Sequence, residues 1–267
     1  MINIKTEKEI LVMADGGKIL ANILKELTKS VKPGITTKEL DKLARELVFK
    51  FGVKPAFLNY GGFPAVLCTS VNEEIVHGVP SERKLKEGDV LKLDMGVMHK
   101  GFNTDSAVTV LVGNSSIKKF QRLLGSESRS KASGDYSRKL KLLSVTKKSL
   151  EIGIKEARIG NRVGDIGFAI QKYVEGEGLN LVRDLVGHGI GRELHEDPQV
   201  PNYGKSGTGE KLKEGMVIAI EPMVVAGDWK IKDGDDGFTF KTKDGSLSAH
   251  FEHTVAIMEK GALVLTR

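Results

Sequence analysis

Residues 85–97 read LKEGDVLKLDMGV, and residues 212–224 read LKEGMVIAIEPMV. The two stretches share Leu, Lys, Glu, Gly and two Val positions at an offset of 127 residues, and they place Asp94 opposite Glu221. Each is a glycine turn followed by an apolar run that contains one acidic residue. A carboxylate in a buried strand is costly unless it is paired or bound to a metal. Two acids at equivalent places in a repeated unit therefore predict a shared site.

The helices upstream repeat in the same way. PGITTKELDKLARELVFKFG (33–52) aligns with IGNRVGDIGFAIQKYVEGEG (159–178) at an offset of 126. Both segments end at a glycine, as helix C-termini often do. Both carry apolar residues at helical spacing, namely Leu40, Leu43 and Leu47 in the first and Ile166, Ile170 and Val174 in the second. A nearly constant offset across helix and strand argues against chance similarity, so we expect one domain built from two pseudo-symmetric halves, about 1–113 and 140–267.

The composition is that of an ordinary globular chain. Its 267 residues are 40% hydrophobic and 28% charged, which is enough for a large core. It contains no apolar run of about 18 residues, so we expect no transmembrane helix. The N-terminus lacks the apolar centre of a signal peptide. A single cysteine, Cys68, excludes an internal disulfide and fits a reducing cytosol, so we expect a cytoplasmic protein.

The net charge of +6 is concentrated in residues 117–148, where ten basic residues face two acidic ones. This segment therefore carries +8 and the remainder −2. Residues 125–139 are polar and serine-rich, which predicts a flexible loop within an insertion at about 114–139. A helix is expected from near Leu140, with a stripe at Leu143, Thr146, Leu150, Ile154 and Ala157. We favour a solvated surface excursion; the alternative is contact with an anionic surface such as RNA.

Strand-like runs follow the helices at 65–71, 89–98, 104–112, 216–225 and 250–259. Four of them contain an acidic residue: Asp94, Asp105, Glu221 and Glu252. Any one of these could be an edge-strand or surface charge. Four carboxylates that converge without a counter-charge would repel one another and raise their pKa values. A pair of divalent cations resolves that repulsion.

A histidine is the natural fifth ligand. VGHGIGRELHEDP (186–198) places His188 between two glycines, which allow the backbone to turn and approach its target closely. Four carboxylates and one imidazole suit two ions such as Mn, Fe, Co or Zn, whereas closed structural zinc sites prefer thiolates. Two bridged ions about 3.5 Å apart make a hydrolytic site. His77 and His195 lie in Gly- or Pro-flanked turns, where a surface or a catalytic histidine fits equally well.

Five sequence blocks resemble type I methionine aminopeptidase: 63–80 (FPAVLCTSVNEEIVHGVP), 93–109, 187–204, 215–224 and 243–257. The resemblance covers nearly the whole chain. It implies an α+β pita-bread fold, a pseudo-symmetric duplication with a central curved antiparallel sheet covered by helices. It also implies a dinuclear centre that removes methionine from the N-termini of nascent proteins, and we expect a monomer. The implied metal ligands are Asp94, Asp105, His188, Glu221 and Glu252.

The same resemblance assigns roles around the metals. His77 would contact the scissile amide, His195 would stabilise the tetrahedral intermediate, and Glu221 would accept a proton. The methionine pocket would be walled by Tyr60, Phe63, Cys68, Leu194 and Phe238. Simple core packing competes with that role, above all for Leu194 and Phe238.

The chain departs from the family pattern in three places. The connection after Asp105's strand is about twenty residues longer than is typical, and Phe63 and Phe238 stand where another aromatic residue is common. The first helix begins by about residue 6, so we expect no zinc-finger extension for ribosome binding. Ribosome contact through the basic insertion is a hypothesis.

Three other functions fit part of the pattern. A prolidase or proline-specific aminopeptidase has similar ligands but normally carries a separate N-terminal domain. A catalytically dead relative that binds RNA or a partner would have lost metal ligands, and all five are present. A dinuclear phosphohydrolase would need cationic clamps for phosphate, for which Arg192 is the only nearby candidate.

Overall fold

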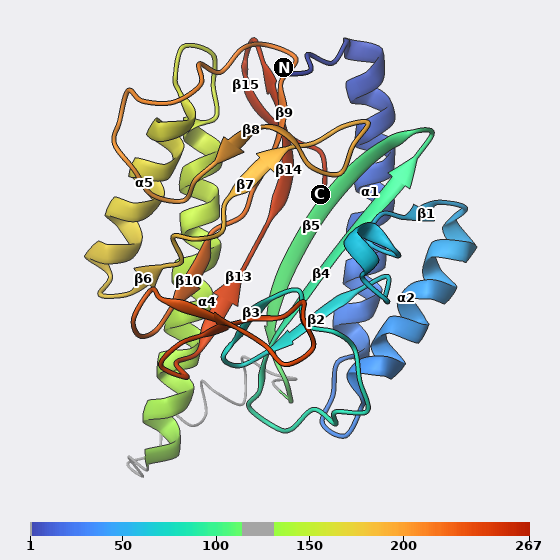
Figure 1. The fold of residues 1–267 in the computed structure, drawn as a ribbon, viewed down its shortest axis with the longest axis vertical. Coiled ribbons are helices and arrows are strands. Elements are labelled where there is room, and N and C mark those ends of the chain that lie inside the picture. The colour runs from blue at the N-terminus through green and yellow to red at the C-terminus, as the bar shows by residue number, and fades with distance from the viewer. Residues whose placement is uncertain (1, 114–130) are drawn as a thin grey trace.

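The computed structural model describes residues 2–113 and 131–267. The helices are α1 (Glu7–Ser30), α2 (Thr37–Phe51), the short 3-10 helix η1 (Tyr60–Gly62), α4 (Lys131–Glu156) and α5 (Val163–Gly176). Figure 1 shows α1 and α2 on one side of the strands and α4 and α5 on the other. Within the described ranges, no helix combines the length and apolar character needed to cross a bilayer.

The strands form antiparallel sheets between these helix pairs. Their bounds are β1 (Lys54–Pro55), β2 (Cys68–Val71), β3 (Glu74–Val76), β4 (Val90–His99), β5 (Phe102–Leu111), β6 (Asn180–Leu181), β7 (Gly187–Gly189), β8 (Glu196–Val200), β9 (Val217–Ile220), β10 (Met223–Val225), β11 (Ile231–Asp233), β12 (Phe240–Thr242), β13 (Ser248–His250), β14 (His253–Met258) and β15 (Gly261–Val264). One sheet has the order β1-β4-β2 with β5 also paired to β4, and another has the order β15-β14-β9-β7-β8. The smaller sheets are β13-β10-β6 and β11-β12-β3. The predicted α+β class is confirmed.

The predicted duplication is visible in the backbone. Gly88 and Gly215, equivalent turn residues of the LKEG segments, have φ of 81° and 82°, a left-handed conformation that glycine adopts without strain. Isolated β-bridges also lie at equivalent places. Each joins the residue before an LKEG segment to the residue before a helix: Lys84 pairs with Thr36, and Lys211 pairs with Arg162. The two halves therefore share one local construction.

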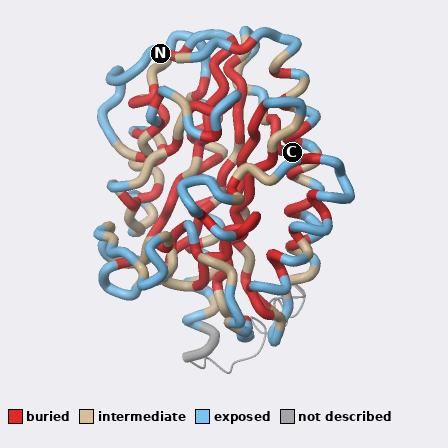
Figure 2. Tube along the Cα trace, turned by 45° about the vertical axis from the view of Figure 1, so that its right-hand side comes forward, coloured by how far each residue is buried: buried red, intermediate tan, exposed pale blue. Residues whose placement is uncertain are grey.

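Each half has its own hydrophobic core. Figure 2 shows that the buried residues are concentrated in the strands and on the inner faces of the helices. In the first half, Leu40 and Leu47 of α2 are buried in a cluster with residues of α1 and β4. In the second, Ile166, Ile170 and Val174 of α5 are fully buried. The helical stripes read from the sequence thus face the two hydrophobic cores, as the hydrophobic effect requires.

The halves meet along a polar seam between β5 and the β13–β14 segment, which lie side by side in Figure 1. Hydroxyl groups bridge the two backbones here in place of a regular strand ladder. The pairs are Thr254 with both backbone groups of Asp105, Ser106 with the carbonyl of Glu252, and Thr109 with both backbone groups of His250. The seam places the acidic residues of the two halves at one interface.

Lys92, in β4, is a second connection between the halves. Its side chain is fully buried, and its Nζ donates to the carbonyls of Asn72 (2.8 Å) and Ser248 (3.2 Å) and to the Ser248 hydroxyl (3.1 Å). Burial lowers the Lys92 pKa to about 7. Three acceptors match the three hydrogens of an ammonium group, so the lysine links β4 directly to β13.

Two of the five predicted strands are interrupted. The 216–225 run divides into β9 and β10. The 250–259 run divides into the end of β13, a strand that begins before residue 250, and β14. Glu221 and Glu252 therefore lie in the interruptions and not inside strands, whereas Asp94 and Asp105 lie within the continuous β4 and β5. Pro222 follows Glu221 and cannot donate to a ladder, which accounts for one of the two breaks.

Helix α4 begins earlier than predicted. It starts at Lys131, so the expected loop at 125–139 is wrong for its second half, and residues 114–130 lie outside the described residues. Asp135 and Lys139 form an i,i+4 ion pair at 2.8 Å, a contact that helical geometry favours.

The buried face of α4 also includes a glycine, Gly153, where an added Cβ would lie 2.7 Å from Ile170 of α5. Counting apolar residues misses such small residues.

Candidate metal centre

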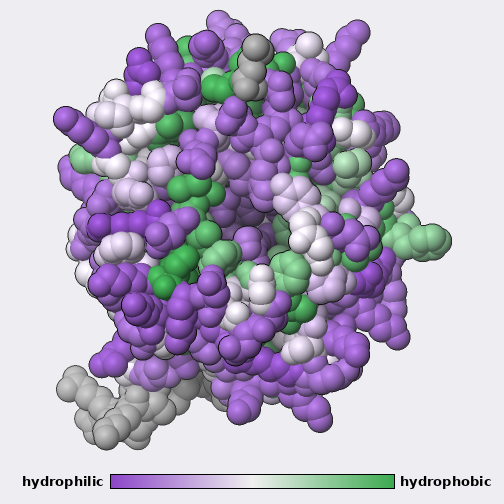
Figure 3. Space-filling view, viewed as in Figure 1, coloured by the Kyte–Doolittle hydropathy of each residue, from purple (hydrophilic) through white to green (hydrophobic). Residues whose placement is uncertain are grey.

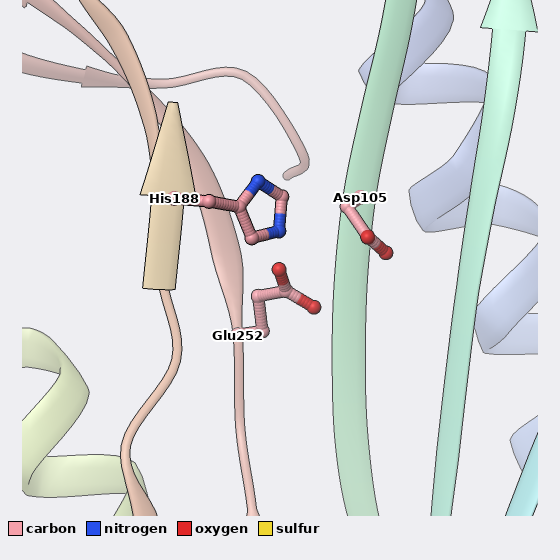
Figure 4. Close-up of side chains that lie close together, drawn as sticks. All are labelled: Asp105, His188 and Glu252. Carbon is pink, nitrogen blue, oxygen red and sulfur yellow. The ribbon is translucent and has the colours of Figure 1, made fainter. Parts of the chain in front are cut away.

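Three potential metal ligands meet at the seam. Asp105 comes from β5, His188 from β7, and Glu252 from the interruption between β13 and β14 (Figure 4). One ligand atom from each lies within 4.8 Å of the others. Asp105 and Glu252 are buried, and only 12% of the His188 side chain is exposed. Two acids from different halves and an imidazole thus surround one point.

Asp94 and Glu221 line the same cavity as these three residues. The strand register explains Glu221: Ile220 pairs with His253 and Met223 with His250, so the Glu221 interruption lies opposite the Glu252 one. Glu221 Oε1 is 3.7 Å from His188 Nε2. All five ligands predicted from the sequence therefore reach one cavity.

The electrostatics of this cluster fit divalent cations. Burial, followed by the charges of neighbouring carboxylates, raises the pKa values of Asp94, Glu221 and Glu252, and burial raises the pKa of Asp105 to about 7. In the described ranges no lysine or arginine pairs with any of them, and Asp94 Oδ1 and Asp105 Oδ1 have no hydrogen-bond partner there. Buried, unpaired carboxylate oxygens are an oxygen-rich donor set for hard or borderline cations.

His188 is oriented as a ligand would be. Its Nδ1 is 2.8 Å from the carbonyl of Gly189, so Nδ1 donates and Nε2 keeps its lone pair. Burial lowers the His188 pKa to about 4, which keeps the ring neutral. The flanking glycines permit close backbone packing and not the predicted tight turn: an added Cβ at Gly187 would lie 2.4 Å from the Ala219 carbonyl, and β7 is extended.

The cavity has an apolar end beside the acids. The face of the molecule drawn in Figure 3 has a hollow with hydrophobic side chains beside it. The predicted wall residues Tyr60, Phe63, Cys68, Leu194 and Phe238 all line it. Its volume is about 140 Å³, close to the ~150 Å³ that holds a benzene-sized group. One side chain of moderate size fits.

His77 and His195 stand at the rim of the cavity and stay accessible from it. Surrounding protein removes much of their hydration, which lowers the pKa of His77 to about 4 and also lowers the pKa of His195. His195 Nδ1 is 2.8 Å from the Tyr60 hydroxyl. The next residue, Glu196, forms a buried 2.6 Å ion pair with Lys5. These contacts fix the segment that carries His195.

Two residues at the site had no predicted role. Phe57 lines the cavity, and its ring packs so closely on Gly96 that an added Cβ there would lie 2.8 Å away. In the sequence, only the position of Phe57 three residues before Tyr60 could have suggested a place at the site. His250 Nε2 lies 3.5 Å from Glu221 Oε2. Nothing in the sequence pattern pointed to that contact, because it depends on how β10 and β13 pair.

The candidate phosphate clamp is engaged elsewhere. Arg192 is exposed, its guanidinium pairs with Glu9 at 2.9 Å, and it lies 4.7 Å from the centre of the Phe102 ring. It does not line the cavity. A dinuclear phosphohydrolase would need a cation at the metals, so this arrangement disfavours that function.

Known proteins resemble the whole chain. Methionine aminopeptidase from Clostridium acetobutylicum is 46% identical, with 100% of this chain and 99% of the relative covered, and methionine aminopeptidase 1 from Bacillus subtilis is 47% identical over 100% of both. The crystal structure of a Thermotoga maritima methionine aminopeptidase matches 100% of both chains with a TM-score of 0.90 at 46% identity.

More distant structures share the fold alone. A prolidase from Pyrococcus horikoshii has a TM-score of 0.74 at 20% identity, and 63% of its chain is covered. The pita-bread architecture predicted from the sequence is confirmed by these neighbours. The profile of metallopeptidase family M24 matches residues 12–259, so with its buried carboxylate cluster and full-length relatives the chain belongs to metallopeptidase family M24.

Proposed function

We propose that this protein is a methionine aminopeptidase that removes the N-terminal methionine from nascent proteins. The observation that carries the proposal is one cavity that joins five potential metal ligands to an apolar pocket for a single side chain. The names of the full-length relatives support the substrate. The retained ligand set argues against a catalytically dead RNA-binding relative.

In this proposal Asp94, Asp105, His188, Glu221 and Glu252 hold two divalent ions, with Co, Mn, Fe and Zn as candidates. The donor set of four carboxylates and one imidazole suits all four of these metals. When bound, the ions would polarise the scissile carbonyl and lower the pKa of the attacking water. They would also neutralise the carboxylates, whose mutual repulsion is otherwise unrelieved.

The remaining steps belong to side chains of the cavity. Glu221, which reaches the cavity from a break between strands, accepts the proton of the attacking water and passes it to the leaving amine. His77 lies at the rim on the opposite half of the chain from His195, so the two imidazoles flank the scissile bond. Their lowered pKa values keep both rings neutral near pH 7.

Tyr60 sets the tautomer of His195. The Tyr60 hydroxyl lies 2.8 Å from His195 Nδ1, and we infer that the phenol, which is protonated near neutral pH, is the donor. The proton of the neutral ring then resides on Nε2, which can donate to the oxygen that becomes negative in the tetrahedral intermediate. Both residues lie beside the pocket that would hold the methionine side chain.

The pocket selects methionine by shape and polarity. Phe57 and Phe63 are nearly buried, and the Phe63 and Phe238 rings meet edge to face at 5.5 Å. An unbranched thioether contacts aromatic rings favourably, whereas a charged side chain would lose its hydration there. The acids at the other end of the cavity would place the free α-amine of the substrate.

The substrate test uses purified protein reconstituted with Mn or Co. It should release methionine from a Met-Ala-Ser peptide, because the peptide offers a free amine and an unbranched first residue. It should release no residue from an Xaa-Pro dipeptide and no phosphate from a phosphoester. An N-acetylated Met-Ala-Ser peptide is the matched control. Cleavage of the acetylated peptide, or of the Xaa-Pro dipeptide alone, would refute the proposal.

Cytoplasmic location, a monomeric state and ribosome contact complete the proposal. The single cysteine, buried at the pocket, fits a reducing compartment. Three basic residues of the 117–148 segment form ion pairs: Lys139 with Asp135, Lys141 with Glu177 and Lys148 with Glu151.

A further inference from the structure

His250 is a buried imidazole without a role in the reaction above. It is the last residue of β13 and is 1% exposed. Neither of its ring nitrogens has a hydrogen-bond partner in the described part of the chain. Buried polar side chains are nearly always paired, so an unpaired ring in this position requires an explanation.

The ring faces Glu221. His250 Nε2 is 3.5 Å from Glu221 Oε2, while the other carboxylate oxygen, Oε1, is 3.7 Å from His188 Nε2. The Glu221 carboxylate thus lies between one imidazole that would bind metal and one that does not line the cavity. Because N–H···O bonds run to about 3.2 Å, a small rotation of either side chain completes the contact with His250.

The backbone of His250 is anchored by hydrogen bonds to the first half of the chain. The Thr109 hydroxyl accepts from the His250 amide at 2.9 Å and donates to its carbonyl. Two residues earlier, Ser248 receives two hydrogen bonds from the buried Lys92. Both anchors come from the first half of the chain, so the seam between the halves fixes the position of the ring.

We propose that His250 is a positioning residue for Glu221, whose Oε2 accepts a hydrogen bond from the His250 Nε2–H. This bond would orient the carboxylate so that Oε1 faces the cavity and the metals. The inference rests on the proposed metal site and adds a residue to it. Partners that orient a ligand typically change metal affinity or activity by ~10- to 100-fold when they are removed.

The first test measures metal affinity and turnover. Chelator-stripped protein is titrated with Mn in a calorimeter. His250→Phe fills the same space without a donor and should weaken Mn binding ~10- to 100-fold and lower kcat more than it raises KM. His250→Gln restores an N–H at a similar reach and should recover most of both. His253→Gln is the matched control, because His253 also neighbours Glu252 but its Nδ1 contacts Thr266 at 2.8 Å.

Failure of the inference and failure of the proposed function are distinguishable. If the unaltered protein binds no Mn, the metal site itself is wrong. If it binds Mn and His250→Phe binds it equally well, or if a folded His250→Gln is as impaired as His250→Phe, the positioning role is wrong. An equal loss in His253→Gln would also contradict that role, since it would indicate general damage.

The second test needs no change at His250. In ¹⁵N-histidine-labelled protein loaded with diamagnetic Zn, which keeps Glu221 ionised, the His250 ring should show the Nε2–H tautomer. Glu221→Gln should shift the His250 ring signals and leave those of His253 in place. An Nδ1–H tautomer, or ring signals that do not respond to Glu221→Gln, would overturn the proposal.

Discussion

Replacing Glu221 by alanine is expected to abolish methionine release while the protein stays folded. The substitution removes both a ligand and the proton acceptor, and a positioned acid or base alone contributes ~10²–10⁴-fold. We therefore expect kcat/KM to fall by at least that amount. In metal-free protein the same change removes one of four buried carboxylates that raise one another's pKa values, so its Tm should be unchanged or higher.

The measurements are methionine release and thermal unfolding of the metal-free protein. Glu214→Gln is a matched control: it lies in the same LKEG segment, is exposed, and should leave both quantities unchanged. Residual activity within tenfold of the unaltered protein would refute the role of Glu221. A large drop in metal-free Tm would show that Glu221 stabilises the fold, contrary to the electrostatic account.

Metal is expected to stabilise the protein more strongly as the pH rises. In the metal-free fold the pKa of Asp105 is about 7, above its ordinary value of 3.8. A group with a raised folded pKa loses its contribution to stability as the pH rises through the interval between the two values. The pKa values of Asp94, Glu221 and Glu252 are also raised. Metal needs the ionised forms, so binding releases protons and gains strength with pH.

The measurement is the difference in Tm between metal-loaded and chelator-stripped protein at pH 6 and pH 8. Lys92, whose pKa burial lowers to about 7, titrates in both forms and cancels in the difference. Each proton released adds about 1.4 kcal/mol per pH unit, which corresponds to ~3–6 °C for a chain of roughly this size. Asp105→Asn should reduce the slope. A Tm difference that is constant or shrinks as the pH rises would contradict the account.

The elements that could be predicted are those fixed by local chemistry. Gly88 and Gly215 need a left-handed backbone, and acids such as Asp94 and Asp105 stand out in apolar strands. Both signals can be read from single residues, because a turn with positive φ favours glycine and a buried carboxylate needs a partner or a metal. The α2 and α5 stripes were equally legible, since each helix buries one face in a hydrophobic core.

The elements that escaped prediction depend on contacts between the halves. The breaks at Glu221 and Glu252 arise where strands pass from one sheet to another, which strand periodicity does not report. His250 and Lys92 look like ordinary polar residues of strands until β13 is placed beside β5 and β4. Helix α4 starts early, in a stretch whose serines predicted a loop, and the i,i+4 ion pair of Asp135 with Lys139 was not read as a helical signal.

The central claim is that four carboxylates and His188 hold divalent metal at the seam between the halves. Anomalous diffraction from crystals soaked in Mn tests it most directly. The account predicts two peaks within bonding distance of Asp94, Asp105, His188, Glu221 and Glu252, both lost in Asp105→Asn crystals or reduced to one. Well-ordered crystals with no peak at these side chains, or with Mn bound only elsewhere, would contradict it.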